Sequence, residues 1–226
     1  MTNFSPNMLK TFQACPQKYK FKYVDNISLP QKSSFFEKGK KVHALANYYL
    51  QGNDISKLEK ALNETEMTAW QNLKNNKFFN MAYVNSEYNL SCKVGAHWIG
   101  GRLDALVKAT HTPTPSPLKG EGNEVYYILD YKTGSIPKNP EYDYQTMVYL
   151  LCLSNATFVK PQNCLKFVYI DLKNNQNCVI DFKPQRQKEY EKAICEICDK
   201  IENFQFPENI EHQKMCDFCE YKKICI

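Results

Sequence analysis

An aspartate and a lysine lie two residues apart at the end of the apolar segment YYILDYKTG, residues 126–134. This segment is typical of an interior β-strand, in which residues i and i+2 point to the same face. Asp130 and Lys132 are therefore expected to share one face. Burying both charges is costly unless each is compensated, and a salt bridge between them is the plain structural interpretation. A same-strand pair at this spacing seldom has the best geometry, however, and a second carboxylate lies nearby in the sequence.

The second carboxylate is Asp104, in the strand-like segment HWIGGRLDALVKA at residues 97–109. We expect the two strands to pair as an antiparallel hairpin, which brings Asp104 near Asp130. Because two converging carboxylates repel each other, one takes up a proton unless a cation lies between them. Mg²⁺ or Mn²⁺ suits such a site, since both prefer oxygen ligands and accept substrate phosphate. Lys132 would then help to position an attacking water or to stabilise charge that builds on phosphorus.

The hydrophobic pattern predicts an α/β fold with a mixed central sheet flanked by helices, as a single domain over residues 1–226. Ser5 is the expected N-cap of a first helix, with Pro6 at its first helical position. The other expected helices cover about 35–50, 56–75, 141–154 and 184–204, and the expected strands cover 82–92, 97–109, 124–133, 165–172 and 178–182. Residues 110–123, rich in Pro, Thr, Ser and Gly, are predicted to be a flexible hairpin insertion. Residues 205–226 are predicted to be a cysteine-bearing tail without helical or strand period.

Three further polar residues lie where helices are predicted. His43 could add a nitrogen ligand to a metal, although a lone helical histidine is more often a satisfied core or surface residue. Gln145 and Tyr149 stand four residues apart and so share one helix face. The expected core stripe of that helix falls at Tyr144, Val148 and Leu151. Gln145 and Tyr149 are then expected to lie to the side of the core, as a polar pair on the flank of the helix.

The order of these motifs resembles the RecB-type branch of the PD-(D/E)xK nucleases, over about residues 4 to 225. The motifs are GxxxH (Gly39 to His43), GRLD (ending at Asp104), DxK (Asp130 and Lys132) and QxxxY (Gln145 and Tyr149). The resemblance implies a restriction-endonuclease-like core and metal-dependent cleavage of DNA. It implies that His43, Asp104, Asp130 and the Tyr131 carbonyl hold the metal, that Lys132 is the catalytic lysine, and that Gln145 and Tyr149 contact the DNA backbone. Glu87 lies on the preceding strand, where some relatives carry an extra acid.

Cysteines bracket the chain. The C-terminal tail carries C-x2-C-x5-C, at Cys216, Cys219 and Cys225, and Cys15 near the other end is the candidate for a fourth ligand. Cysteine ligation fits either zinc or an iron–sulfur cluster. This arrangement is similar to the iron–sulfur staple of AddB-type helicase-nucleases and of cluster-bearing CRISPR-associated nucleases, which implies a [4Fe–4S] cluster rather than zinc. A clip that joins residues 15 and 216 would close a very long loop and so stabilise the fold.

The remaining cysteines are interpreted as packing residues. Cys195 and Cys198 also form C-x2-C, but they lie in a helix whose apolar stripe is expected at Tyr190, Ile194, Ile197, Ile201 and Phe204. Buried cysteines behave as small hydrophobic residues. The same interpretation is given to the cysteines in apolar stretches, Cys92, Cys152, Cys164 and Cys178.

The bulk composition fits an ordinary globular protein. The chain has 226 residues and a net charge of +5, which is compatible with a polyanionic partner but too small to indicate one. No apolar run reaches the length of a membrane span, and the N-terminus does not read as a signal peptide, so a cytoplasmic protein is expected. In that compartment the ten cysteines stay reduced, which favours metal ligation over disulfides.

The leading functional hypothesis is a metal-dependent DNA nuclease that acts on single strands or duplex ends. Its setting would be DNA repair or degradation, beside a helicase, or the trimming of DNA before CRISPR spacer integration. The alternatives are a catalytically idle DNA-binding scaffold that keeps the fold and cluster, and a zinc-stapled protein whose DxK is only an ion pair. The lysines and aromatics of residues 8–24 would guide the DNA strand or, alternatively, the aromatics would pack around the cysteines.

Overall fold

The computed structural model describes residues 3–29, 36–110, 124–207 and 214–225. The helices are α1 (Pro6–Ala14), α2 (Pro16–Tyr19), α3 (Phe36–Leu50), α4 (Ser56–Lys60), α5 (Glu64–Lys74), α6 (Tyr144–Ser154), α7 (Pro184–Glu202) and α8 (Lys222–Cys225). Shorter helical segments are a π-helix at Lys20–Val24 and 3₁₀ turns at Pro140–Tyr142 and Lys214–Phe218. The strands are β1 (Asn3–Phe4), β2 (Ala82–Val94), β3 (His97–Thr110), β4 (Glu124–Lys132), β5 (Cys164–Asp171) and β6 (Gln176–Asp181).

Within these described residues, six strands form one mixed sheet in the order β1-β3-β4-β5-β6, with β2 also paired to β3. β3 runs antiparallel to both β2 and β4, as the expected hairpin requires. β4 and β5 are parallel, and α6 lies between them in the chain as the crossover connection. Buried on both faces, β4 is the central strand, and it carries Asp130 and Lys132 at its C-terminal end.

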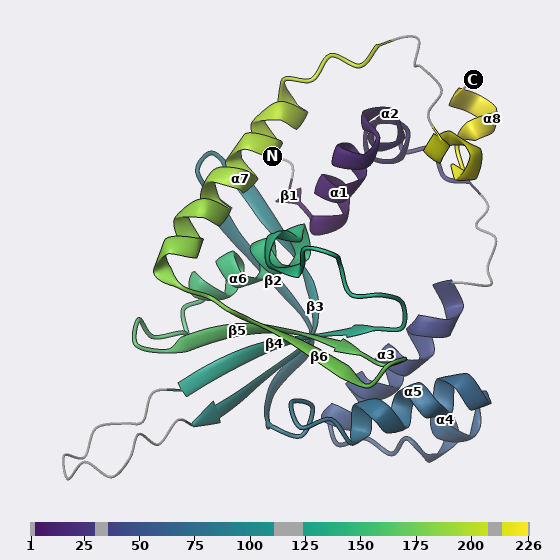
Figure 1. The fold of residues 1–226 in the computed structure, drawn as a ribbon, viewed down its shortest axis with the longest axis vertical. Helices are drawn as coiled ribbons and strands as arrows, with labels where there is room; N and C mark the ends of the chain where they lie inside the picture. The colour runs from purple at the N-terminus through teal and green to yellow at the C-terminus, as the bar shows by residue number, and fades with distance from the viewer. Residues whose placement is uncertain (1–2, 30–35, 111–123, 208–213, 226) are drawn as a thin grey trace.

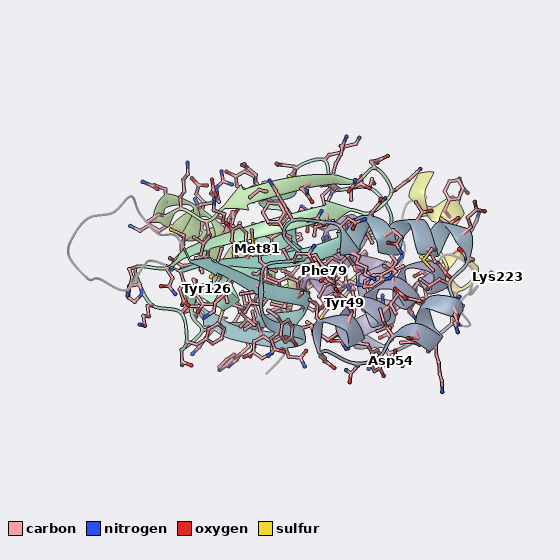
Figure 2. All side chains as sticks on the ribbon, turned by 90° about the horizontal axis from the view of Figure 1, so that it is seen from below. Tyr49, Asp54, Phe79, Met81, Tyr126 and Lys223 are labelled. Carbon is pink, nitrogen blue, oxygen red and sulfur yellow. The ribbon has the colours of Figure 1, made fainter. Side chains whose placement is uncertain are left out.

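Two hydrophobic cores cover the two faces of the sheet. One core joins the sheet to α1, α6 and α7 through residues such as Phe12, Val148 and Ile194. The other joins the opposite face to α3 and α5, and Figure 1 shows these two helices beside α4, away from α7. In the second core Tyr49 stacks on Phe79, with ring centroids 5.9 Å apart, and Figure 2 shows the two residues close together. The C-terminal end of β4 is therefore enclosed by α6 on one face and α3 on the other.

The predicted order of helices and strands in the core is confirmed, with differences at the element ends. The single helix expected over 56–75 is instead two helices, because Asn63 caps α5 through a capping box with Glu66. The tail was expected to lack helical structure, but a 3₁₀ turn contains Cys216 and α8 contains Cys225. Most of the predicted insertion, residues 111–123, lies outside the described residues, as do parts of the tail.

Two side-chain predictions were wrong. Cys164 is exposed, because it is the first residue of β5 and lies at the end of the sheet. Tyr149 belongs to the core rather than to the flank of its helix, since α6 is packed between the sheet and the helices α1 and α7. The other packing predictions hold for the fully buried Cys198 and for Cys92 and Cys152. Among the described residues, no helix combines the length and apolarity that a membrane crossing requires.

Candidate active site

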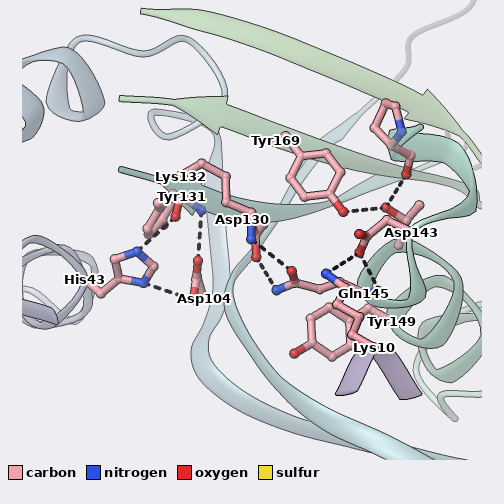
Figure 3. Close-up of polar contacts among 12 residues, drawn as sticks. Lys10, His43, Asp104, Asp130, Tyr131, Lys132, Asp143, Gln145, Tyr149 and Tyr169 are labelled. Carbon is pink, nitrogen blue, oxygen red and sulfur yellow. Dashed lines mark hydrogen bonds and ion pairs between the residues drawn. The ribbon is translucent and has the colours of Figure 1, made fainter. Parts of the chain in front are cut away.

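Asp130 and Lys132 form an ion pair at the end of β4. Lys132 Nζ lies 2.7 Å from Asp130 Oδ2, so the salt bridge that the spacing made questionable is present. The pair is poorly directed, however, because the buried Oδ2 accepts no well-aligned hydrogen bond. Gln145 on α6 spans the two charges: its Oε1 accepts from Lys132 Nζ over 2.9 Å, and its Nε2 donates to Asp130 Oδ1 (Figure 3). The neighbouring helix therefore fixes the positions of both strand charges.

Asp104 and His43 meet on the other side of the same strand end. One oxygen of Asp104 accepts from the backbone N–H of Tyr131 over 2.8 Å, and the other lies 3.1 Å from His43 Nδ1. His43 Nε2 lies 3.0 Å from the carbonyl oxygen of Tyr131. Figure 3 shows the imidazole of α3 between these two acceptors. Because both ring nitrogens face an oxygen, the doubly protonated ring satisfies both contacts.

The charges of this cluster shift the pKa values of two members. Burial, followed by the charge of Asp104, raises the pKa of Asp130 to about 7, and the opposing effect of Lys132 is smaller. Burial alone would lower the pKa of His43, but the hydrogen bond to Asp104 and the charges of Asp104 and Asp130 outweigh it, so this pKa is raised. Without a bound cation, the site therefore holds protons near neutral pH.

Glu87 on β2 supplies a third carboxylate. Ligand atoms of His43, Glu87 and Asp104 lie within 4.8 Å of one another. Glu87 has a positive φ of 48°, a backbone conformation that is uncommon for a residue with a side chain and that marks a local irregularity of the strand. The side chain also pairs with Arg102, whose Nε lies 2.8 Å from Glu87 Oε2. The sequence alone could not have shown this conformation.

Tyr149 and Gly101 fit closely together. The Tyr149 hydroxyl donates to the carbonyl oxygen of Arg102 over 2.8 Å, and the side chain is buried. A Cβ at Gly101 would lie 2.9 Å from Tyr149 Cε1 and 3.4 Å from Pro6 Cδ. Tyr149 therefore holds the strand segment that leads to Asp104, whereas Gln145 reaches the charges directly.

The donor set fits a hard divalent cation. It combines one imidazole, carboxylates and a backbone carbonyl, and a buried carboxyl with a raised pKa indicates negative charge that a cation would neutralise. His43, Asp104, Asp130 and the Tyr131 carbonyl could hold such an ion, with Glu87 beside them. Of the residues that the sequence proposed for this cation, the structure places His43, Asp104 and the Tyr131 carbonyl in direct contact, with Glu87 in the same group, whereas the carboxylate of Asp130 faces Gln145 and Lys132.

The cysteines named from the sequence also converge. A pocket between the N-terminal helices and the tail is lined by Cys15, Cys216, Cys219 and Cys225. Burial raises the pKa of Cys225, and the three other thiols add to this effect, as expected for neighbouring sulfurs. Two residues that line the pocket also hold the two chain ends together. Lys18 Nζ lies 2.9 Å from Glu220 Oε2, and the Tyr221 hydroxyl donates to the carbonyl of Ile27 over 2.9 Å.

The N-terminal aromatics pack rather than lie open to solvent. Phe12, Tyr19 and Phe21 are buried, and Phe12 meets Tyr19 edge to face at 5.4 Å. Of the two interpretations of this segment, packing of the aromatics is therefore the one the structure supports. Sequence reasoning missed Asp143, which caps α6 by accepting from the Gln145 N–H over 2.9 Å. An aspartate directly before a helical pattern is the signal that could have identified it.

Comparison with known proteins gives one family match and fold-level similarity. The crystal structure of a candidate exonuclease from Eubacterium rectale aligns with a TM-score of 0.55 at 13% identity, covering 96% of this chain and 87% of that one. The structure of SSO0001 aligns with a TM-score of 0.37 at 14% identity, covering 97% and 94%. No curated protein sequence matches the chain. The model of the PD-(D/E)XK nuclease superfamily matches residues 3–114 and 118–226. With nearly its whole length matched, the chain belongs to the PD-(D/E)XK nuclease superfamily.

Proposed function

We propose that this protein is a metal-dependent DNA nuclease that hydrolyses phosphodiester bonds. The observation that carries the proposal is the convergence of His43, Asp104, Asp130 and Lys132 around the backbone of Tyr131. Three of these side chains offer ligands for a cation, and the fourth is a lysine on the same strand. Membership of the nuclease superfamily supports this chemistry.

His43, Asp104, Asp130 and the Tyr131 carbonyl would hold Mg²⁺ or Mn²⁺. Such an ion supplies a Lewis acid that activates water and offsets charge on the scissile phosphate. To act as ligands, the residues must first lose protons, because His43 and Asp130 both have raised pKa values. Glu87 would serve as an additional acid at the edge of this ligand set.

Lys132 and Gln145 would position the reacting groups. The Lys132 ammonium lies over the ring of Tyr169, 5.4 Å from its centroid, which restricts where the side chain can reach. From this position its N–H groups can orient a water or donate to a phosphate oxygen. Gln145 holds both Lys132 and Asp130, and its amide could exchange one of these contacts for the DNA backbone. Tyr149 would contribute indirectly, by holding the segment of β3 that leads to Asp104.

We further propose exonuclease action on single strands or duplex ends. The fold similarity to the Eubacterium rectale candidate exonuclease supports this choice. The protein would act in the cytoplasm, in DNA repair or degradation with a helicase, or in the processing of DNA for CRISPR spacer integration. An idle DNA-binding scaffold would not need to keep all of Asp104, Asp130 and Lys132 in one cluster, and the nuclease is preferred for that reason.

The pocket of four cysteines would hold a [4Fe–4S] cluster. Support comes from the convergence of Cys15 with three tail cysteines and from the arrangement of the ligands around the catalytic motifs. Zinc is the alternative occupant. Iron and acid-labile sulfide would be measured together with zinc on anaerobically purified protein. A stoichiometric zinc content without iron would replace the cluster by a zinc site.

The nuclease is tested on end-labelled single- and double-stranded DNA. The protein is purified without oxygen and assayed with Mn²⁺ or with EDTA, beside the variants Lys132→Ala and Lys108→Ala. Lys108 is also an ion-paired lysine, bound to Glu124. It lies on β3 beyond Asp104, away from the end of β4 that carries Lys132. We expect the wild-type protein to cleave DNA in Mn²⁺ but not in EDTA. Lys132→Ala should abolish this cleavage, and Lys108→Ala should retain it. An inactive wild-type protein that still binds DNA would support the scaffold instead.

A further inference from the structure

Lys10 on α1 lies beside the catalytic network although no motif includes it. Its Nζ is 2.8 Å from Asp143 Oδ1, and 36% of its side chain is exposed. Asp143 is mostly buried, and the same oxygen accepts the backbone N–H of Gln145 over 2.9 Å. Figure 3 shows Lys10 next to Asp143 and Tyr149. Lys10 belongs to a helix that is distant in the sequence, and it contacts the N-terminal end of α6.

A short series of contacts connects Lys10 with the charges at the end of β4. Asp143 binds the main chain of Gln145, and the side chain of Gln145 binds Lys132 and Asp130. Two lysines, Lys10 and Lys132, thus flank Gln145 from different elements. Asp104 lies toward His43 on the other side of the strand end, whereas Asp130 contacts Gln145 and Lys132.

The charge balance leaves Lys10 able to bind an anion. An ammonium has three N–H donors, and Asp143 accepts one of them. The Asp143 charge is already engaged by Lys10 and by an amide at the N-terminus of α6, and the carboxylate is largely shielded from water. An approaching phosphate therefore meets the partly exposed lysine before it meets the aspartate.

We propose that Lys10 binds a backbone phosphate of the DNA strand next to the scissile bond, and so positions the strand over Lys132. This role rests on the proposed nuclease function and adds a residue of α1 to it. The contact is electrostatic and independent of sequence, so it contributes to substrate binding for every DNA sequence. Lys10 does not touch the reacting atoms, and its loss raises KM more than it lowers kcat.

Three variants separate phosphate binding from a structural role. Lys10→Met keeps an unbranched side chain of similar length and removes the charge. Lys10→Arg keeps the charge. Asp143→Asn keeps an oxygen that can cap α6 and releases Lys10 from its ion pair. Lys108→Met is the matched control, because Lys108 pairs with Glu124 at 2.7 Å and has 40% of its side chain exposed.

Binding is measured by fluorescence anisotropy with a labelled 20-nucleotide single strand, in Ca²⁺ to prevent cleavage, between 50 and 300 mM salt. Lys10→Met is expected to weaken binding about five-fold at 0.1 M salt and to lower the salt slope by about 0.7, the value for one phosphate contact on a single strand. Lys10→Arg restores both quantities, and Lys108→Met leaves them unchanged. Asp143→Asn binds at least as tightly as wild type, since it frees the lysine.

Two results would overturn the assignment of Lys10. One is a salt slope for Lys10→Met equal to that of the wild type. The other is a loss in Asp143→Asn as large as in Lys10→Met, which would show that the ion pair acts only to dock α1 on α6. Wild-type protein that neither binds nor cleaves DNA would instead remove the nuclease proposal itself, and Lys10 with it. Cleavage assays on the same preparations distinguish these cases.

Discussion

The side chain of Gln145 donates to Asp130 with its amide nitrogen and accepts from the ammonium of Lys132 with its oxygen. A residue of α6 thereby bridges the two charges of β4, which are also in direct contact with each other. In this arrangement the amide keeps the carboxylate and the lysine in place when no cation is bound. A cation that binds Asp130 would then take the place of the Gln145 amide as the partner of this carboxylate. The side chains of the site are therefore already in position before an ion binds.

Asp130→Ala tests the ligand assignment. The change removes a buried carboxylate that repels Asp104 and carries a raised pKa, which offsets part of the cost of leaving Lys132 without its ion-pair partner, so the protein is expected to stay folded with some loss of stability. Mn²⁺-dependent cleavage should fall below detection, because a ligand is lost. Thermal denaturation and cleavage are measured on the same sample, with Asp181→Ala as the control for an exposed strand aspartate. Cleavage at the wild-type rate would exclude Asp130 as a metal ligand.

Metal affinity should depend on pH through Asp130. Burial and the charge of Asp104 raise the pKa of this carboxyl to about 7, so it is protonated below that pH and ionised above it. Since only the carboxylate binds the cation, the apparent Kd for Mn²⁺ should rise about tenfold for each pH unit below 7. The raised pKa of His43 adds to this effect in the same direction.

Calorimetry between pH 5.5 and 8.5, in buffers of different ionisation enthalpy, measures the protons that Mn²⁺ releases. The number of protons released per bound Mn²⁺ should decline as the pH rises above 7. In Asp130→Asn the contribution of this carboxyl disappears, whereas that of His43 stays. A proton release that is the same at pH 6 and pH 8.5 would show that Asp130 is already ionised in the metal-free protein.

Gly101→Ala should destabilise the protein through Tyr149. The added Cβ would lie 2.9 Å from the Tyr149 ring, which is buried and bonded to Arg102, so the ring has little room to move. Overpacking of this kind costs about 1–3 kcal/mol, which lowers the melting temperature by several degrees. Gly134→Ala is the control, because a Cβ there meets no atom within 4 Å. Equal melting temperatures for the two variants would mean that Tyr149 relaxes freely.

Cys219→Ala tests the proposed cluster of the cysteine pocket. The variant keeps three of the four thiols, and we expect visible absorbance to be lost together with the constraint that joins the chain ends. By the loop-closure model a clip of this length contributes roughly 5 kcal/mol, equivalent to about 10 °C or more in melting temperature. Cys164→Ala, at an exposed cysteine, is the control. Unchanged absorbance and melting temperature would exclude Cys219 as a ligand.

The sequence allowed the strands and the position of the charges to be predicted because their signals are local. A continuous apolar run within residues 124–132 identifies β4, and the spacing of Asp130 and Lys132 places them on one face. The pairing of β3 with β4 followed from two strand-like segments separated by a turn-rich insertion. These features depend on neighbours in the chain, so the residue types are sufficient to predict them.

The position of Tyr149 could not be predicted, because α6 is buried almost all round and its sequence shows no distinct polar face. Helical periodicity then cannot tell which side faces solvent. The conformation of Glu87 was also hidden, since a glutamate gives no indication of a positive φ. Lys10 was among the lysines expected to guide a DNA strand, but its contact with Asp143 could not be predicted, because it joins residues 133 positions apart.

Helix α1 begins where Pro6 lies against Gly101 and ends where Cys15 enters the cysteine pocket. Its nine residues span about 14 Å, and Lys10 is the fifth of them. The proposed cluster and the proposed phosphate contact of Lys10 would therefore lie along the same short helix. Loss of the proposed cluster in air would then be expected to displace Lys10 and weaken DNA binding, although no proposed catalytic residue is altered.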